Sequence, residues 1–156
     1  IVDLARIVTD SLEDLRYRID ERCLLVDSDI QDPVPVRANE AELGQIVTNL
    51  LTNAIKFSPE QGSIRVTAGP VGHAALVEIE DQGPGISEQD RARVFERFYR
   101  SARAVSDGVP GSGIGLSVAQ ALAGAMGGAI LLSEAESGGT LATLRLPLSE
   151  EPLSER

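Results

Sequence analysis

Segments with helical periodicity alternate along this chain with segments of strand periodicity, and short turns separate several of the strands. Apolar residues spaced by three and four predict amphipathic helices at 3–19, 42–57 and 116–126. Apolar and polar residues alternate over 64–68 and 75–81, which predicts an antiparallel hairpin. The pattern favours an α+β fold, a two-layer sandwich of one mixed, mostly antiparallel sheet with helices on one face. A doubly wound parallel sheet fits less well, because hairpins join neighbouring strands.

Shorter elements complete the expected fold. Further strands are expected at 23–26, 34–36, 129–132 and 141–146. We interpret the acidic stretch between the first two as a loop, and Cys23 as a small core residue. Ser87 and Asp90 resemble a capping box that opens a helix running through Phe98. Residues 101–115 lack periodicity, so we expect a long functional loop there.

Composition bounds the domain organisation and the classes of partner. The chain has 156 residues with 42 % apolar content, which suits one domain over 1–148, followed by a flexible acidic tail at 149–156. A net charge of −10 argues against binding to nucleic acid or to an anionic membrane. No apolar run reaches the length of about 18 residues that a membrane span needs, so we expect no direct membrane contact. A cytoplasmic location is expected for the domain, and whether its parent protein is membrane-anchored stays open. Because the chain begins at Ile1 rather than Met, we expect it to be part of a longer protein.

Basic residues and glycines gather in one stretch of this acidic chain. Five of its 14 basic residues lie between Arg91 and Arg103, and seven of its 15 glycines lie between Gly108 and Gly128. Glycines just before a helix leave backbone N–H groups free for an anion, although neither a P-loop nor a dinucleotide fingerprint is present. The arginines form either a solvated helix face or contacts to phosphate or to an acidic partner.

A polar stripe runs along the helix at 42–57. Asn49, Asn53 and Lys56 are spaced by four and three residues, so they share one face. Amide oxygens suit a hard divalent cation, and an ammonium group suits phosphate. The alternative is a merely solvated helix face.

Asp81 follows the inward-facing register of its strand. A carboxylate on that side is costly unless it is hydrogen-bonded. Gly83 and Gly85 follow at once and allow the backbone to approach a ligand closely. The combination suggests an acceptor for an exocyclic amine such as that of adenine; the alternative is an aspartate that only forms a turn at the strand end.

Five segments resemble the sequence motifs of sensor histidine kinases. They are NLLTNAIKF at 49–57 (N box), DQGPG at 81–85 (G1 box), FERFY at 95–99 (F box), GSGIGL at 111–116 (G2 box) and GGT at 138–140. Their order and spacing match the family, and the resemblance runs from about Leu4 to Leu148. It implies the catalytic ATP-binding domain of a two-component histidine kinase. This domain belongs to the superfamily of gyrase, heat-shock chaperone and mismatch-repair ATPases, with their Bergerat-type fold.

The resemblance assigns roles that agree with the chemistry of the residues. It implies that Asp81 accepts from the adenine amine, that Asn53 and Asn49 hold Mg²⁺, and that residues 95–113 form a lid over ATP. Within that lid, Arg97 is the arginine expected nearest the phosphates. The residues that it places at ATP are Asn49, Asn53, Lys56, Phe57, Asp81, Gly83, Gly85, Ile86, Arg97, Gly111, Ser112, Gly113, Ile114, Gly115, Leu116 and Thr140.

Two features favour phosphoryl transfer over hydrolysis. Hydrolysing members of the superfamily carry a glutamate base where this chain has Asn49, and an amide does not accept a proton at neutral pH. The single histidine, His73, lies in the turn of a hairpin and is interpreted as a surface residue. We therefore expect no catalytic residue in this chain and a phosphoacceptor histidine on a separate dimerisation domain. The alternatives are a superfamily ATPase or a nucleotide-binding docking module.

The implied partners follow from that assignment. They are the dimerisation and phosphoacceptor domain of the same protein and a response regulator, in a two-component signalling pathway. The isolated domain is expected to be monomeric and its parent protein homodimeric.

Overall fold

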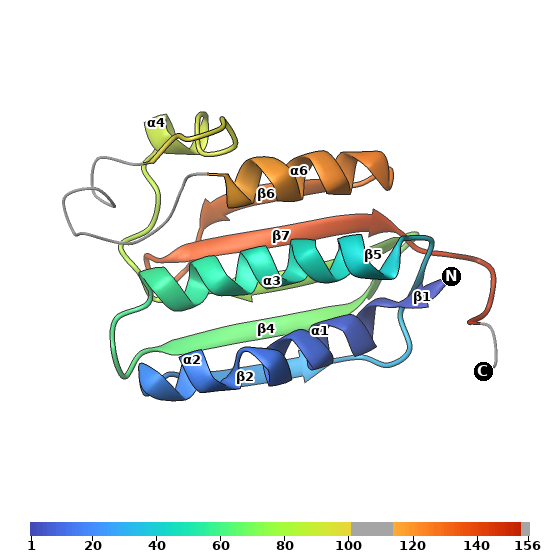
Figure 1. Cartoon of the computed structure of the whole chain (residues 1–156), viewed down its shortest axis with the longest axis horizontal. Coiled ribbons are helices and arrows are strands. Elements are labelled where there is room, and N and C mark those ends of the chain that lie inside the picture. The colour runs from blue at the N-terminus through green and yellow to red at the C-terminus, as the bar shows by residue number, and fades with distance from the viewer. Residues whose placement is uncertain (101–113, 154–156) are drawn as a thin grey trace.

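The computed structural model describes residues 1–100 and 114–153. Its helices are α1 (Leu4–Asp14), α2 (Arg16–Glu21), α3 (Glu40–Phe57), α4 (Glu88–Arg91) and α6 (Gly115–Ala125). Its strands are β1 (Val2–Asp3), β2 (Leu25–Ile30), β3 (Pro35–Val36), β4 (Ser63–Val71), β5 (Ala74–Glu80), β6 (Ala129–Glu134) and β7 (Thr140–Pro147). Figure 1 shows α1, α3 and α6 side by side over one face of the main sheet.

The main sheet has five strands in the order β2-β4-β5-β7-β6. β2 runs parallel to β4, and the other neighbouring strands are antiparallel. β1 and β3 form a separate antiparallel pair. The predicted α+β class, with a mixed, mostly antiparallel sheet and helices on one face, is confirmed.

α3 lies at the centre of the helical layer and contacts both α1 and α6. Asn39 begins it, because its side chain accepts a hydrogen bond from the backbone N–H of Glu42 at 3.1 Å. Ser58 ends it, in an extended conformation before Pro59. The buried face is Leu43, Ile46, Val47, Leu50, Leu51, Ala54 and Ile55, as the periodicity predicts.

The first part of the expected acidic loop, residues 27–30, is a strand, so the loop interpretation is wrong there and holds only for residues 31–33. β2 continues through Ile30 and pairs in register with β4. It lies at an edge of the sheet and most of its side chains are exposed, so it needs no alternation of apolar residues. Asp27 instead lies 3.6 Å from Arg65 on the neighbouring strand, as an ion pair.

Three local expectations also differ from the structure. The first helix is interrupted at Leu15, which separates α1 from α2. Cys23 is exposed in a left-handed turn with φ 54°, and its neighbour Leu24 is buried instead. The Ser87 hydroxyl does cap α4, but this helix ends at Arg91 rather than continuing through Phe98. Phe98 has φ 63°, which no helix accommodates.

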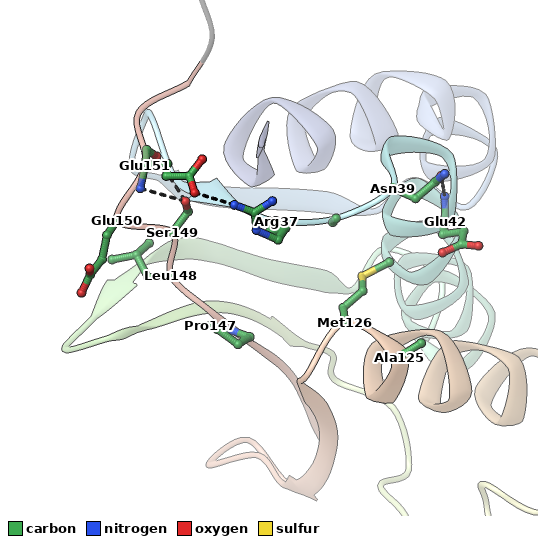
Figure 2. A pocket seen from close by; sticks show the side chains of 11 residues that line it. Arg37, Asn39, Glu42, Ala125, Met126, Pro147, Leu148, Ser149, Glu150 and Glu151 are labelled. Carbon is green, nitrogen blue, oxygen red and sulfur yellow. Dashed lines mark hydrogen bonds and ion pairs between the residues drawn. The ribbon is translucent and has the colours of Figure 1, made fainter.

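The first residues after β7 contact the body of the domain. The backbone N–H of Ser149 donates to the oxygen of Pro35 at 2.9 Å, and Arg37 lies 2.6 Å from Glu151. Figure 2 shows this ion pair beside a hollow of about 710 Å³, between the start of α3, the end of α6 and the segment after β7. Within the described residues, no helix has the length and apolarity that a membrane span requires.

Candidate functional site

The motif residues meet at one end of the sandwich. The C-terminal end of α3, the end of β5, the start of β7 and the start of α6 all lie at this end (Figure 1). The hollow of Figure 2 lies at the opposite ends of α3 and α6. Residues of four separate segments are thereby brought together.

The polar stripe of α3 faces the start of α6. Asn49, Asn53 and Lys56 are each half-buried. The Asn49 amide nitrogen donates to the backbone oxygen of Gly115 at 3.1 Å, so this side chain links the two helices rather than being only solvated. The amide oxygens of Asn49 and Asn53 are hard donors of the kind that Mg²⁺ takes, and the Lys56 ammonium adds a positive charge beside them.

Asp81 is a buried carboxylate at the end of β5, only 6 % exposed. Its Oδ1 accepts hydrogen bonds from the N–H of Gly83 at 2.8 Å and of Thr140 at 3.2 Å. Burial raises the pKa of Asp81, as does the nearby Glu80, while the two backbone bonds lower it less. Oδ2 accepts no hydrogen bond from residues 1–100 or 114–153.

The structure bears on the turn interpretation of Asp81, and its role as a ligand acceptor stays a prediction. The bond from Gly83 closes the turn at the strand end, which uses one carboxylate oxygen. The other oxygen remains for a donor from outside the described chain, such as an exocyclic amine.

Glycines let the backbone segments of the site approach without intervening side chains. A Cβ on Gly83 would lie 2.6 Å from the Phe57 oxygen, and one on Gly85 would lie 2.7 Å from the Gly138 oxygen. Gly85 also has φ 76°, which favours glycine. These contacts explain the residue type at both predicted positions.

Two residues of this region carry no role in the sequence interpretation. A Cβ on Gly139 would lie 2.0 Å from the backbone oxygen of Asp81, so only glycine fits there. The Ser137 hydroxyl lies 3.4 Å from the same oxygen and 3.5 Å from Glu80. The GGT motif was the only signal for Gly139, and no sequence pattern indicates Ser137.

In the arginine-rich segment after α4, some side chains pair with other side chains of the same region. Arg93 bonds to Glu96 at 3.2 Å and lies 4.6 Å above the ring of Tyr99. The Tyr99 hydroxyl bonds to Asp90. Arg97, the residue expected nearest the phosphates, is exposed. Arg93 is thus paired with an acidic side chain of its own segment.

The remaining predicted residues divide into two groups. Half-buried residues near the site are Phe57, Ile86, Ile114, Leu116 and Thr140. Gly111, Ser112 and Gly113 lie outside the described residues.

Comparison with known proteins places this site in a family. The family model described as "Histidine kinase-, DNA gyrase B-, and HSP90-like ATPase" matches residues 38–150. The signal transduction histidine-protein kinase/phosphatase MprB of Mycolicibacterium vanbaalenii is 39 % identical over 142 residues, covering 89 % of this chain and 28 % of that protein. MprB of Mycolicibacterium smegmatis is 40 % identical over 141 residues, covering 88 % and 27 %. The chain thus spans under a third of these relatives.

Solved structures of histidine kinases are also similar to this chain. The structure of mycobacterial sensor histidine kinase MprB has a TM-score of 0.84 and 34 % identity, covering 94 % of this chain and 95 % of that one. Full-length ShkA, solved in complex with AMPPNP, has a TM-score of 0.79 and 28 % identity, covering 95 % of this chain and 30 % of that one. The catalytic domain of histidine kinase ThkA, at 21 % identity, shares the fold, with a TM-score of 0.81 and coverage of 94 % of both chains.

Proposed function

Because the chain belongs to the histidine kinase-, DNA gyrase B- and HSP90-like ATPase family, as the ATP-binding catalytic domain of a histidine kinase, we propose that it holds ATP with Mg²⁺. It presents the γ-phosphate to a histidine of another domain. The observation that carries this proposal is the buried Asp81, with one oxygen bonded to the backbone and the other available.

Asp81 selects adenine in this proposal. Oδ2 accepts from the exocyclic amine, while Gly83 and Thr140 hold the carboxylate in place through Oδ1. A fixed, partly desolvated acceptor gives a strong hydrogen bond, because it loses little freedom when the ligand arrives.

The polar stripe of α3 binds the other end of the nucleotide. The amide oxygens of Asn53 and Asn49 fit Mg²⁺, which usually keeps waters and phosphate oxygens as its other ligands. A bound Mg²⁺ supplies charge neutralisation for the phosphates, and Lys56 adds to it. The backbone N–H groups of Gly111, Gly113 and Gly115 are proposed donors to the phosphates. Ser112, Ile114 and Leu116 complete this segment, and Arg97 is the proposed arginine.

The residue composition of the site favours transfer to a nucleophile over attack by water. Asn49 stands where a base would have to be, and an amide takes no proton from water. The bond from the Asn49 amide nitrogen to the Gly115 oxygen leaves Oδ1 for the metal. The phosphoacceptor histidine and its base then belong to the dimerisation domain of the parent sensor kinase, which we propose to be a homodimer that passes phosphate to a response regulator.

Calorimetric titration with AMPPNP, with and without Mg²⁺, tests the binding step. We expect binding that the metal strengthens, and hydrolysis of ATP by the isolated chain that is slow. With γ-labelled ATP, we expect no label on His73, and label on a separately supplied dimerisation domain of the parent protein. Rapid Mg²⁺-dependent turnover by the chain alone would identify a hydrolase instead, and label on His73 would contradict the separation of donor and acceptor.

A further inference from the structure

Arg22 holds the segment that follows α3. It comes directly after α2, and its Nη2 donates to the backbone oxygen of Ser58 at 2.5 Å. The backbone oxygen of Arg22 also accepts from the N–H of Gln61 at 3.1 Å. One residue thus contacts this segment through both its side chain and its backbone.

The Arg22 side chain is placed at some cost. Its Nε is buried and finds no hydrogen-bond partner among the described residues. A buried donor without a partner disfavours the folded state. The hydrogen bond from Nη2 to the Ser58 backbone oxygen is the contact that offsets this penalty. By contrast, Arg16 and Arg18 of α2 are exposed, and their side chains form no hydrogen bond or ion pair to any residue in 1–100 or 114–153.

The Arg22 guanidinium bonds to the backbone at the C-terminal end of α3. Ser58 follows the last helical residue of α3 in an extended conformation, so its backbone oxygen lies outside the helical hydrogen bonds and needs a donor from another segment. Ser58 is 1 % exposed, and both its N–H and its hydroxyl bond to the oxygen of Ala54, at 3.1 and 2.6 Å. The Ser58 oxygen is therefore fixed in place, and the Arg22 cation satisfies it.

The same helix end carries the phosphate-binding side of the proposed site. Lys56 lies in the last turn of α3, and Asn53 lies one turn earlier. The Phe57 oxygen is packed so closely on Gly83 that a Cβ there would lie 2.6 Å away. A displacement of this turn would therefore move Lys56 and Asn53 relative to Gly83, which bonds to Asp81.

We propose that Arg22 is a positioning residue for the nucleotide site. By binding the Ser58 oxygen, it fixes the last turn of α3 at the distance from the Asp81–Gly83 turn that a nucleotide requires. This proposal rests on the function proposed above. Arg22 touches neither adenine nor phosphate, and it acts through the helix end that presents Lys56 and Asn53.

The test compares Arg22→Ala with Arg22→Lys, using Arg18→Ala on the preceding helix α2 as a matched control. Affinities for Mg-ATP and for adenosine are measured by calorimetry, at a temperature where circular dichroism shows each variant folded. We expect Arg22→Ala to weaken Mg-ATP binding about tenfold and adenosine binding about twofold, because the phosphate side loses its position. Arg22→Lys should restore most of the loss, and Arg18→Ala should bind as wild type.

If Arg22→Ala does not fold, Arg22→Gln takes its place, because it keeps the apolar stem and a donor but removes the charge. Wild-type affinity in the Arg22 variant would overturn the proposal. Equal losses for ATP and adenosine would also overturn it, since they would indicate general loosening of the domain. Failure of the wild-type chain to bind Mg-ATP would instead contradict the proposed function, so the two failures are distinguishable.

Discussion

At the scale of single residues, Asp81 occupies a place that disfavours its own charge. Burial raises the pKa of this carboxyl above its ordinary value, despite the bonds from Gly83 and Thr140. A carboxyl whose pKa is raised by folding contributes stability that is fully present below its unfolded pKa, about 3.9. That contribution is lost as pH rises through the folded pKa. Ionisation of Asp81 therefore lowers the stability of the nucleotide-free domain relative to the protonated form.

Asp81→Asn is expected to separate these two effects. The amide oxygen still accepts from Gly83 and Thr140, so the free energy of unfolding at pH 7 should stay equal or rise in urea titrations. The amide nitrogen, however, is a donor facing the adenine amine, so Mg-ATP affinity should fall about 10- to 100-fold by calorimetry. In the wild type, affinity should decline as pH falls through the pKa of Asp81.

The control is Asp29→Asn, at an exposed position on β2. It should change neither the free energy of unfolding nor the Mg-ATP affinity. Unchanged ATP affinity in Asp81→Asn would remove this residue from the site.

Residue-level prediction from the sequence succeeded where a local period decides the position. The alternation of β5 was enough to place Asp81 inside, and the helical period was enough to gather Asn49, Asn53 and Lys56. It failed for Arg22, whose partner Ser58 lies 36 residues away. No local pattern encodes such a pair, because the contact depends on how α2 packs beside the end of α3.

At the scale of elements, sequence prediction depended on whether an element has a buried face. α3 repeats its apolar residues over its whole length and was predicted almost to its ends. β2 lies at the sheet edge with Asp27 and Asp29 exposed, so its composition resembles that of a loop. α4 has a clear cap but no buried residue, so its capping box indicated where it begins and nothing indicated that it ends after four residues.

Gly44 is a helix-interior glycine that lowers the stability of α3. A Cβ at this helical position would meet nothing within 4 Å, so Gly44→Ala should stabilise the domain by about 0.5–1 kcal/mol in urea unfolding. Mg-ATP affinity should not change, because Gly44 lies more than one turn before Asn49 and more than two turns before Asn53. Gly128→Ala is the opposing control: its Cβ would lie 2.1 Å from the Arg145 oxygen, which should cost roughly 1–3 kcal/mol. Destabilisation by Gly44→Ala would show that α3 is strained there.

At the scale of the whole molecule, the two ends of the helical layer have different chemistry. One end carries the C-terminal turn of α3 and the end of β5 (Figure 1), and Asp81 directly follows β5. The other holds the hollow of Figure 2, with Met126 and Leu148 in its lining and the Arg37–Glu151 pair at its edge. Both side chains of that pair are well exposed, at 72 % and 66 %, so solvent weakens their attraction.

Removal of residues 150–156 tests whether these ends are independent. The truncation deletes Glu151 but keeps the bond from Ser149 to Pro35, so the free energy of unfolding should fall by less than about 1 kcal/mol. Mg-ATP affinity should stay as in wild type, because no described contact of the tail reaches the other end of α3 or α6. Glu151→Gln, which removes only the ion pair, should account for most of any loss. A weaker Mg-ATP affinity in the truncated chain would contradict this independence. It would mean that α3 and α6 shift as rigid helices, so that a change at the hollow also moves Asn49 and Asn53.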